Sequence, residues 1–123
     1  MELLRQRGVG IEAGLATTAD AHRFVGLAGY ERVLRVLIEI DIPDLPLAMA
    51  EADGIAGVLH GTGMRRPILL HGVDATVWPF VERARRERRS TRVGLEDGST
   101  LADGSLATDN AAIVAAAVAV FRG

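Results

Sequence analysis

Short apolar runs alternate with amphipathic stretches along the whole chain, and no low-complexity linker interrupts them. Runs with the character of strands lie at residues 9–15, 33–40, 67–72 and 91–95. Stretches with helical spacing lie at residues 1–7, 17–27, 47–59, 76–89 and 110–121. The run 33–40 is almost continuously apolar, which is typical of a strand covered on both faces. This order of strand–helix units predicts one parallel α/β domain with right-handed crossovers.

Composition limits the classes of protein to consider. The chain has 123 residues and no cysteine, so disulfides and thiolate metal sites are excluded, and histidine and carboxylates are the remaining strong metal ligands. A net charge of −2 gives no reason to expect nucleic-acid binding. No apolar run reaches the roughly 18 residues of a membrane span, and the charged start does not look like a signal peptide. We therefore expect a cytoplasmic protein without membrane contact.

The segment 91–98 carries the most distinctive chemistry. Its sequence TRVGLEDG places Arg92, Glu96 and Asp97 where an apolar run gives way to a polar loop. The carboxyl ends of parallel strands carry ligand-binding loops, so this cluster is a candidate site. On a strand, Arg92 and Glu96 would share one face. A structural ion pair between the arginine and the acids is the alternative interpretation.

These residues carry a resemblance to a known family. The core RVGLED at 92–97 and the stretch DNAAIV at 109–114 resemble the C-terminal half of the β-keto acid cleavage enzymes, which include 3-keto-5-aminohexanoate cleavage enzyme. GIEAGL at 10–15, RVLIE at 35–39, and LLHG with WP between 69 and 79 are similar to strands and helix starts of a divergent branch. The resemblance implies zinc-dependent (β/α)8 barrels that exchange the acyl part of a β-keto acid with acetyl-CoA. The products are acetoacetate and a new acyl-CoA.

The resemblance also implies roles for individual residues. Glu96 matches the carboxylate zinc ligand, Asp97 the neighbouring catalytic carboxylate, and Arg92 an arginine that reaches into the same site. Glu12 matches a further active-site acid. The family's two histidine ligands form a His-x-His pattern that this chain lacks, because its histidines are isolated at positions 22, 60 and 71.

A complete barrel of this type needs roughly 250 residues. The chain therefore resembles the last four strand–helix units, that is, the C-terminal half of a TIM barrel, and we expect it to be inactive alone. Its expected partners are a β-keto acid, acetyl-CoA, and either a second copy or a complementing N-terminal half. A non-catalytic half-barrel used in assembly is one alternative, and an unrelated barrel using Glu96 and Asp97 with magnesium is another.

Three other features stay open on sequence alone. His71 ends a predicted strand on the side of the candidate site, where it would either contact a ligand or act as a structural histidine. Glu39 is placed similarly but has no matched role. The arginines at 83, 85, 86, 88 and 89 would either attract the phosphates of coenzyme A or form a solvated helix end, and the second interpretation is favoured because barrel helices face outward.

Overall fold

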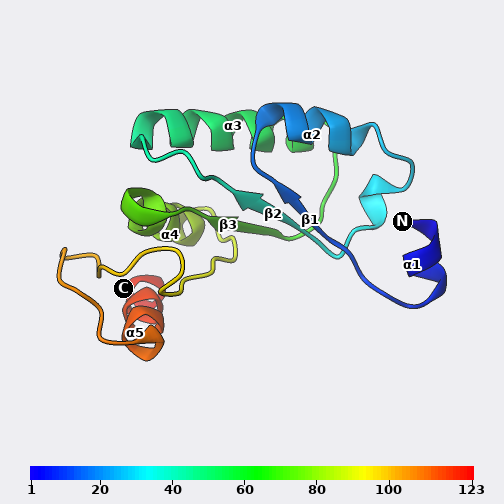
Figure 1. Cartoon of the computed structure of the whole chain (residues 1–123). Helices are drawn as coiled ribbons and strands as arrows, with labels where there is room; N and C mark the ends of the chain where they lie inside the picture. Colours follow the sequence, from blue (N-terminus) through cyan, green and yellow to red (C-terminus); the bar gives the residue numbers. More distant parts are fainter.

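A computed structural model describes residues 1–123 and contains one parallel sheet of three strands. The strands are β1 (Glu12–Leu15), β2 (Arg35–Glu39) and β3 (Ile68–His71), in the order β1-β2-β3. Their arrows point the same way in Figure 1. The predicted parallel α/β architecture is confirmed. The sheet is open, however, and no barrel is closed.

Helices connect and follow the strands. The α-helices are α1 (Glu2–Gln6), α2 (Thr18–Val25), α3 (Leu45–Gly61), α4 (Val77–Arg86) and α5 (Asn110–Arg122). Two 3₁₀ turns, η1 (Tyr30–Arg32) and η2 (Asp74–Thr76), lie before β2 and before α4. None of the helices combines the length and the apolar character that crossing a membrane requires.

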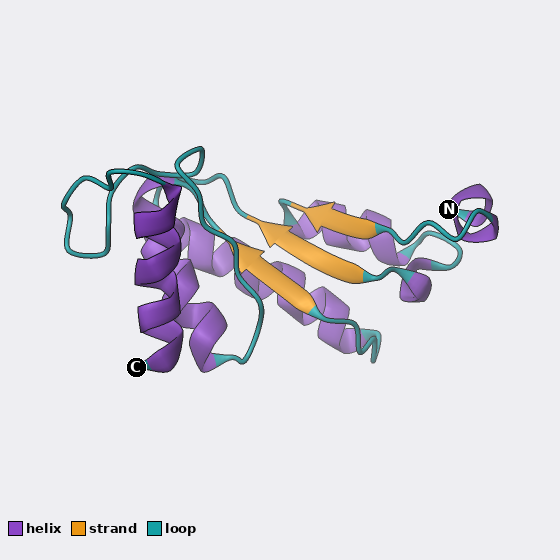
Figure 2. Cartoon of the chain, turned by 90° about the horizontal axis from the view of Figure 1, so that it is seen from below, coloured by secondary structure: helices purple, strands orange, loops and turns teal.

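One face of the sheet is covered and the other is not. Helices α2 and α3 lie side by side on the covered face (Figure 1), and the view from the opposite side has no helix in front of the strands (Figure 2). The main core joins the sheet to the helices through residues such as Ile38, Ile55 and Phe80. Strand residues alternate between the faces. The face without helices therefore carries Leu37 and Leu69, which are absent from that core but are buried, together with the neighbouring pair Glu39 and His71.

The predicted fourth strand at 91–95 is wrong. Only Ser90 bridges to β3: its N–H donates to the Ile68 carbonyl, and its own carbonyl accepts from the Leu70 N–H. The Thr91 hydroxyl then donates to the Leu70 carbonyl at 2.8 Å. If the strand continued, this carbonyl would instead accept the next backbone N–H of the parallel ladder. With this acceptor used and no further strand outside it, the chain leaves the sheet after Ser90.

A second, smaller core holds α5 against α4. It consists of Val77, Val81 and Ala117, with Trp78 and Val93 packed beside them. The Trp78 indole N–H also donates to the Thr100 carbonyl at 2.8 Å, which attaches the long loop to α4. Helix α5 begins where the Asp109 carboxylate accepts from the Ala112 N–H at 2.8 Å.

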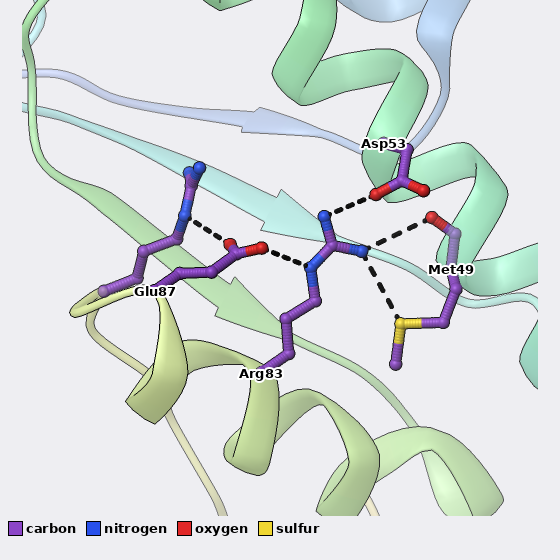
Figure 3. Close-up of polar contacts among 5 residues, drawn as sticks. Met49, Asp53, Arg83 and Glu87 are labelled. Atoms are coloured by element: carbon purple, nitrogen blue, oxygen red, sulfur yellow. Dashed lines mark hydrogen bonds and ion pairs between the residues drawn. The ribbon is translucent and has the colours of Figure 1, made fainter.

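Helix α4 is joined to α3 by a buried arginine. Arg83 donates Nη2 to the Asp53 carboxylate at 2.6 Å and Nε to Glu87 at 3.0 Å, and Nη1 points at the carbonyl and sulfur of Met49 (Figure 3). Only 9% of its side chain is exposed. Its charge is therefore matched by two carboxylates, as burial of a charge requires. This arginine of the 83–89 group is part of the helix packing.

Candidate functional site

A tight turn after Ser90 positions the predicted site residues. The Asp97 N–H donates to the Gly94 carbonyl at 3.0 Å, which closes a turn over residues 94–97. The Asp97 carbonyl accepts from the Asp74 N–H at 2.6 Å, and the Leu95 N–H donates to the Asn110 side chain at 2.8 Å. The turn is thus fixed to the loop after β3 and to the start of α5. Its position is at the carboxyl edge of the sheet.

Three side chains meet at this edge. The last residues of β2 and β3, Glu39 and His71, are register partners. The His71 Nε2 atom lies 3.6 Å from Asp97 Oδ1 and 3.8 Å from Glu39 Oε1. His71 has 1% of its side chain exposed and Asp97 11%, whereas Glu39 has 47%. We call Glu39, His71 and Asp97 the edge cluster.

Buried polar atoms of the edge cluster have no hydrogen-bond partner. These atoms are both ring nitrogens of His71 and Oδ2 of Asp97. The distances of 3.6 and 3.8 Å from the ring to the carboxylates are too long for hydrogen bonds. Nearly all buried polar groups in native proteins are hydrogen-bonded, so these atoms set the edge cluster apart from the other buried side chains. This is the property expected of a binding site.

Burial raises the pKa of Asp97 above its ordinary value of 3.8. The His71 ring opposes the rise, Glu96 adds to it by charge repulsion, Arg92 opposes it and Glu39 adds to it, in that order of size. Because removal from water is the largest cause, the carboxyl group holds its proton more strongly than a surface aspartate. A perturbed carboxyl in a cluster of ionisable groups is typical of functional sites.

The structure places Arg92 and Glu96 beside the edge cluster, both exposed. Arg92 Nη2 lies 3.9 Å from Glu39 Oε1, and 46% of the arginine side chain is exposed. The Glu96 carboxylate folds back over Gly94, where an added Cβ would lie 2.6 Å from Oε1. Because residues 91–95 do not form a strand, the expectation that Arg92 and Glu96 share a strand face does not apply. The turn brings Arg92 and Glu96 to the same edge instead.

Glu12 lies elsewhere. It begins β1, is the register partner of Arg35 at the start of β2, and forms an ion pair with that arginine. Arg35 and Glu39 are the two ends of β2, about 13 Å apart at the usual rise per strand residue. The structure therefore brings Arg92, Glu96 and Asp97 together and leaves Glu12 at the amino edge of the sheet.

The chain by itself does not form a zinc centre. No group of three or more His, Cys, Asp or Glu side chains is arranged to hold a metal ion. The exposed Glu96 carboxylate has the right donor chemistry, but zinc sites need three or four protein ligands. Within residues 1–123, the edge thus offers carboxylates such as Glu96 but no complete set of ligands.

Sequence reasoning left the role of His71 open between ligand contact and structure, and it matched no role to Glu39. Both residues end apolar strands, and a polar residue at the end of an apolar strand is the sequence signal that pointed to the site. What the sequence did not reveal was the register that makes the two residues neighbours.

The fold and site together define an α/β protein with an ionisable cluster at the carboxyl edge of a parallel sheet. Comparison with family models matches residues 44–123 to the beta-keto acid cleavage enzyme family. The chain belongs to this family, and the matched region includes His71, Arg92, Glu96 and Asp97. No curated protein sequence matches the chain.

Proposed function

We propose that this chain supplies one part of the active site of a zinc-dependent β-keto acid cleavage enzyme. The reaction is acyl exchange between a β-keto acid and acetyl-CoA, which yields acetoacetate and a new acyl-CoA. The supporting observation is that Arg92, Glu96 and Asp97 lie on one tethered segment at the carboxyl edge, beside a buried histidine without hydrogen-bond partners. Family membership supports the reaction class.

In this proposal Asp97 is the general base. Its side chain is 11% exposed and its buried Oδ2 atom accepts no hydrogen bond within the chain, so a small movement of the side chain would let it take a proton from the substrate. Burial moves its pKa upward, toward the range in which a carboxylate transfers protons efficiently at neutral pH. The His71 Nε2 atom lies 3.6 Å from Asp97 Oδ1, and its electrostatic interaction favours the charged form of the carboxylate.

Arg92 is the proposed binding group for the substrate carboxylate. Its guanidinium is exposed, and its 3.9 Å approach to Glu39 is a loose contact. A guanidinium can hold a carboxylate through two parallel hydrogen bonds. The substrate would therefore displace the contact to Glu39 and place its keto group over the edge cluster.

Glu96 is the proposed protein ligand of the zinc ion from this chain. When bound, zinc polarises a carbonyl oxygen as a Lewis acid. The remaining ligands would come from further strand–helix units that complete the barrel, in a partner half or elsewhere. For this reason we expect the described chain to be inactive alone. Glu12 is not part of the proposed site, because its ion pair with Arg35 lies at the opposite edge.

A second candidate function is that of a non-catalytic assembly piece. The observation that favours it is an open apolar groove of about 600 Å³ between residues 90–93 and α5. Val114, Val118 and Phe121 line this groove, each with 39% or more of its surface exposed. An exposed apolar patch of this kind marks an interaction surface. A neighbouring strand–helix unit would cover it in either function.

The test measures zinc content and acyl exchange for the chain alone and for the chain co-expressed with an upstream half that carries His-x-His. We expect zinc and activity only in the co-expressed sample. Glu96→Ala should remove both, and Asp97→Asn should retain zinc while lowering kcat by about 10²- to 10⁴-fold, the usual contribution of a general base.

Glu82→Ala is the matched control, since Glu82 is an exposed carboxylate on α4 away from the site. It should leave zinc content and turnover unchanged. Turnover that survives Asp97→Asn would exclude the proposed base. A stable complex without zinc or turnover would favour the assembly piece.

A further inference from the structure

A second cavity lies at the opposite edge of the sheet from the edge cluster. It measures about 370 Å³ and lies where the chain enters β3 and leaves α4. Its polar wall includes His60, Arg66, Glu87, Arg88 and Arg89, and Leu59 and Ile68 contribute to its apolar wall. Ile68 and His71 are the two ends of β3, about 10 Å apart along the strand. The two sites are therefore separate.

The cavity carries more positive charge than its carboxylate can balance. Glu87 is the single acid in its wall, and both of its oxygens are engaged: Oε1 by Arg83 at 3.0 Å and Oε2 by Arg89 at 2.7 Å. Arg66 donates Nε to the Glu31 carbonyl at 3.0 Å, which is neutral. Arg88 takes part in no side-chain hydrogen bond or ion pair. Two guanidinium groups thus face one cavity without a carboxylate partner.

Arg88 occupies a backbone conformation that usually belongs to glycine. Its φ is +56°, in the left-handed region. The Arg88 N–H donates to the Arg85 carbonyl and the Arg89 N–H to the Ala84 carbonyl, at 3.2 and 2.8 Å, which is the hydrogen-bond pattern of a Schellman helix end. Glycine fits this position without steric cost, whereas a side chain destabilises the folded state. Strain of this kind is concentrated at functional positions.

We propose that this cavity binds a phosphate or phosphomonoester dianion. Arg66 and Arg88 provide the charge, since guanidinium groups hold phosphate oxygens through paired hydrogen bonds. His60 and Arg89 complete the polar wall. The apolar wall accommodates a small organic group attached to the phosphate. Arg88 lines the cavity from the left-handed position at the end of α4.

The test uses the full chain with inorganic phosphate as the probe, titrated at low ionic strength by calorimetry. Acetate at matched ionic strength is the singly charged comparison. We expect phosphate to bind and acetate to bind at least tenfold more weakly. Binding of phosphate should weaken as sodium chloride is added.

Arg88→Gly is the decisive variant. It should weaken phosphate binding about tenfold or more, the effect of losing one charge-assisted contact. The same change should raise the midpoint of thermal unfolding, because glycine removes the backbone strain. If Arg88 serves the site, Arg88→Gly should therefore weaken phosphate binding and at the same time raise thermal stability.

Arg85→Ala is the matched control, because Arg85 is an exposed arginine of α4 that does not line the cavity. It should leave phosphate binding unchanged. The proposal is overturned if the unaltered chain does not bind phosphate, if acetate binds equally well, or if Arg88→Gly retains full affinity. Equal weakening by Arg85→Ala would also overturn it, since that result indicates a diffuse charge effect.

Discussion

Two buried ionisable side chains of this molecule, Arg83 and His71, have opposite surroundings. Arg83 between α3 and α4 has a partner for each of its nitrogens, including two carboxylates (Figure 3). His71 at the carboxyl edge is more deeply buried, yet neither ring nitrogen has a partner. Both lie next to acids. The difference is that the chain itself supplies hydrogen-bond partners for Arg83 but none for His71.

Complete hydrogen bonding distinguishes a buried side chain with a structural role from one with a proposed functional role. A buried charge with complete hydrogen bonding stabilises one arrangement of the helices. A buried polar group without partners destabilises the fold and is kept where something outside the chain completes it. Arg83 therefore belongs to the scaffold, whereas His71 is part of the proposed site.

The largest expected effect on stability is that of removing Arg83. Arg83→Ala leaves Asp53 without its cation, removes one of the two arginines that pair with Glu87, and removes the contact to Met49. We expect the free energy of unfolding to fall by about 2 kcal/mol, less than for a fully buried pair because Asp53 is exposed. Urea denaturation of the chain measures this.

Arg85→Ala serves as the comparison for Arg83→Ala, since it removes an exposed arginine from the same helix. It should change the free energy of unfolding by less than about 0.5 kcal/mol. Equal effects of the two substitutions would show that burial and pairing do not distinguish Arg83.

Replacing His71 should change the free energy of unfolding in the opposite direction to replacing Arg83. His71→Leu substitutes an apolar side chain for a buried ring without partners, so we expect the free energy of unfolding to rise by about 1 kcal/mol. His22→Leu, at an exposed position on α2, should have no comparable effect. A marked loss of stability in His71→Leu would mean that the ring is already satisfied and belongs with Arg83.

The smallest expected effect is the contribution of Asp97 to the pH dependence of stability. Because its pKa is raised in the folded state, the protonated form is favoured there relative to the unfolded chain. The stability that this provides is fully present below the unfolded-state pKa and is lost as pH rises through the raised value.

Asp97→Asn does not titrate, so its stability should increase relative to the unaltered chain as pH rises from 3 to 7. Urea denaturation across this range gives the comparison. A difference that stays constant with pH would mean that burial does not shift the Asp97 pKa.

Local sequence signals correctly predicted most of the secondary structure. Thr17 caps α2 by accepting from the Asp20 N–H at 3.0 Å, and a threonine three residues before an acid is a local sequence signal for such a cap. Asp109 caps α5. These interactions span three residues, so neighbouring side chains determine them.

The prediction of a fourth strand was wrong because a strand at the edge of a sheet forms only when its backbone pairs with a neighbouring strand. Residues 91–95 have a suitable pattern, but the Thr91 hydroxyl takes the Leu70 carbonyl and no further strand lies outside. An apolar run becomes a strand only where neighbouring strands complete its hydrogen bonds. The pattern alone therefore overestimated the sheet.

The sequence by itself determined the parallel strand–helix organisation, the caps and the segment bearing Arg92, Glu96 and Asp97, because each depends on residues close together in the chain. Only the tertiary structure decided that Glu39 and His71 join Asp97. It likewise placed Glu12 at the far edge. The reason is that parallel register is set by packing between distant segments, and a polar residue on a strand does not encode which neighbour it will meet.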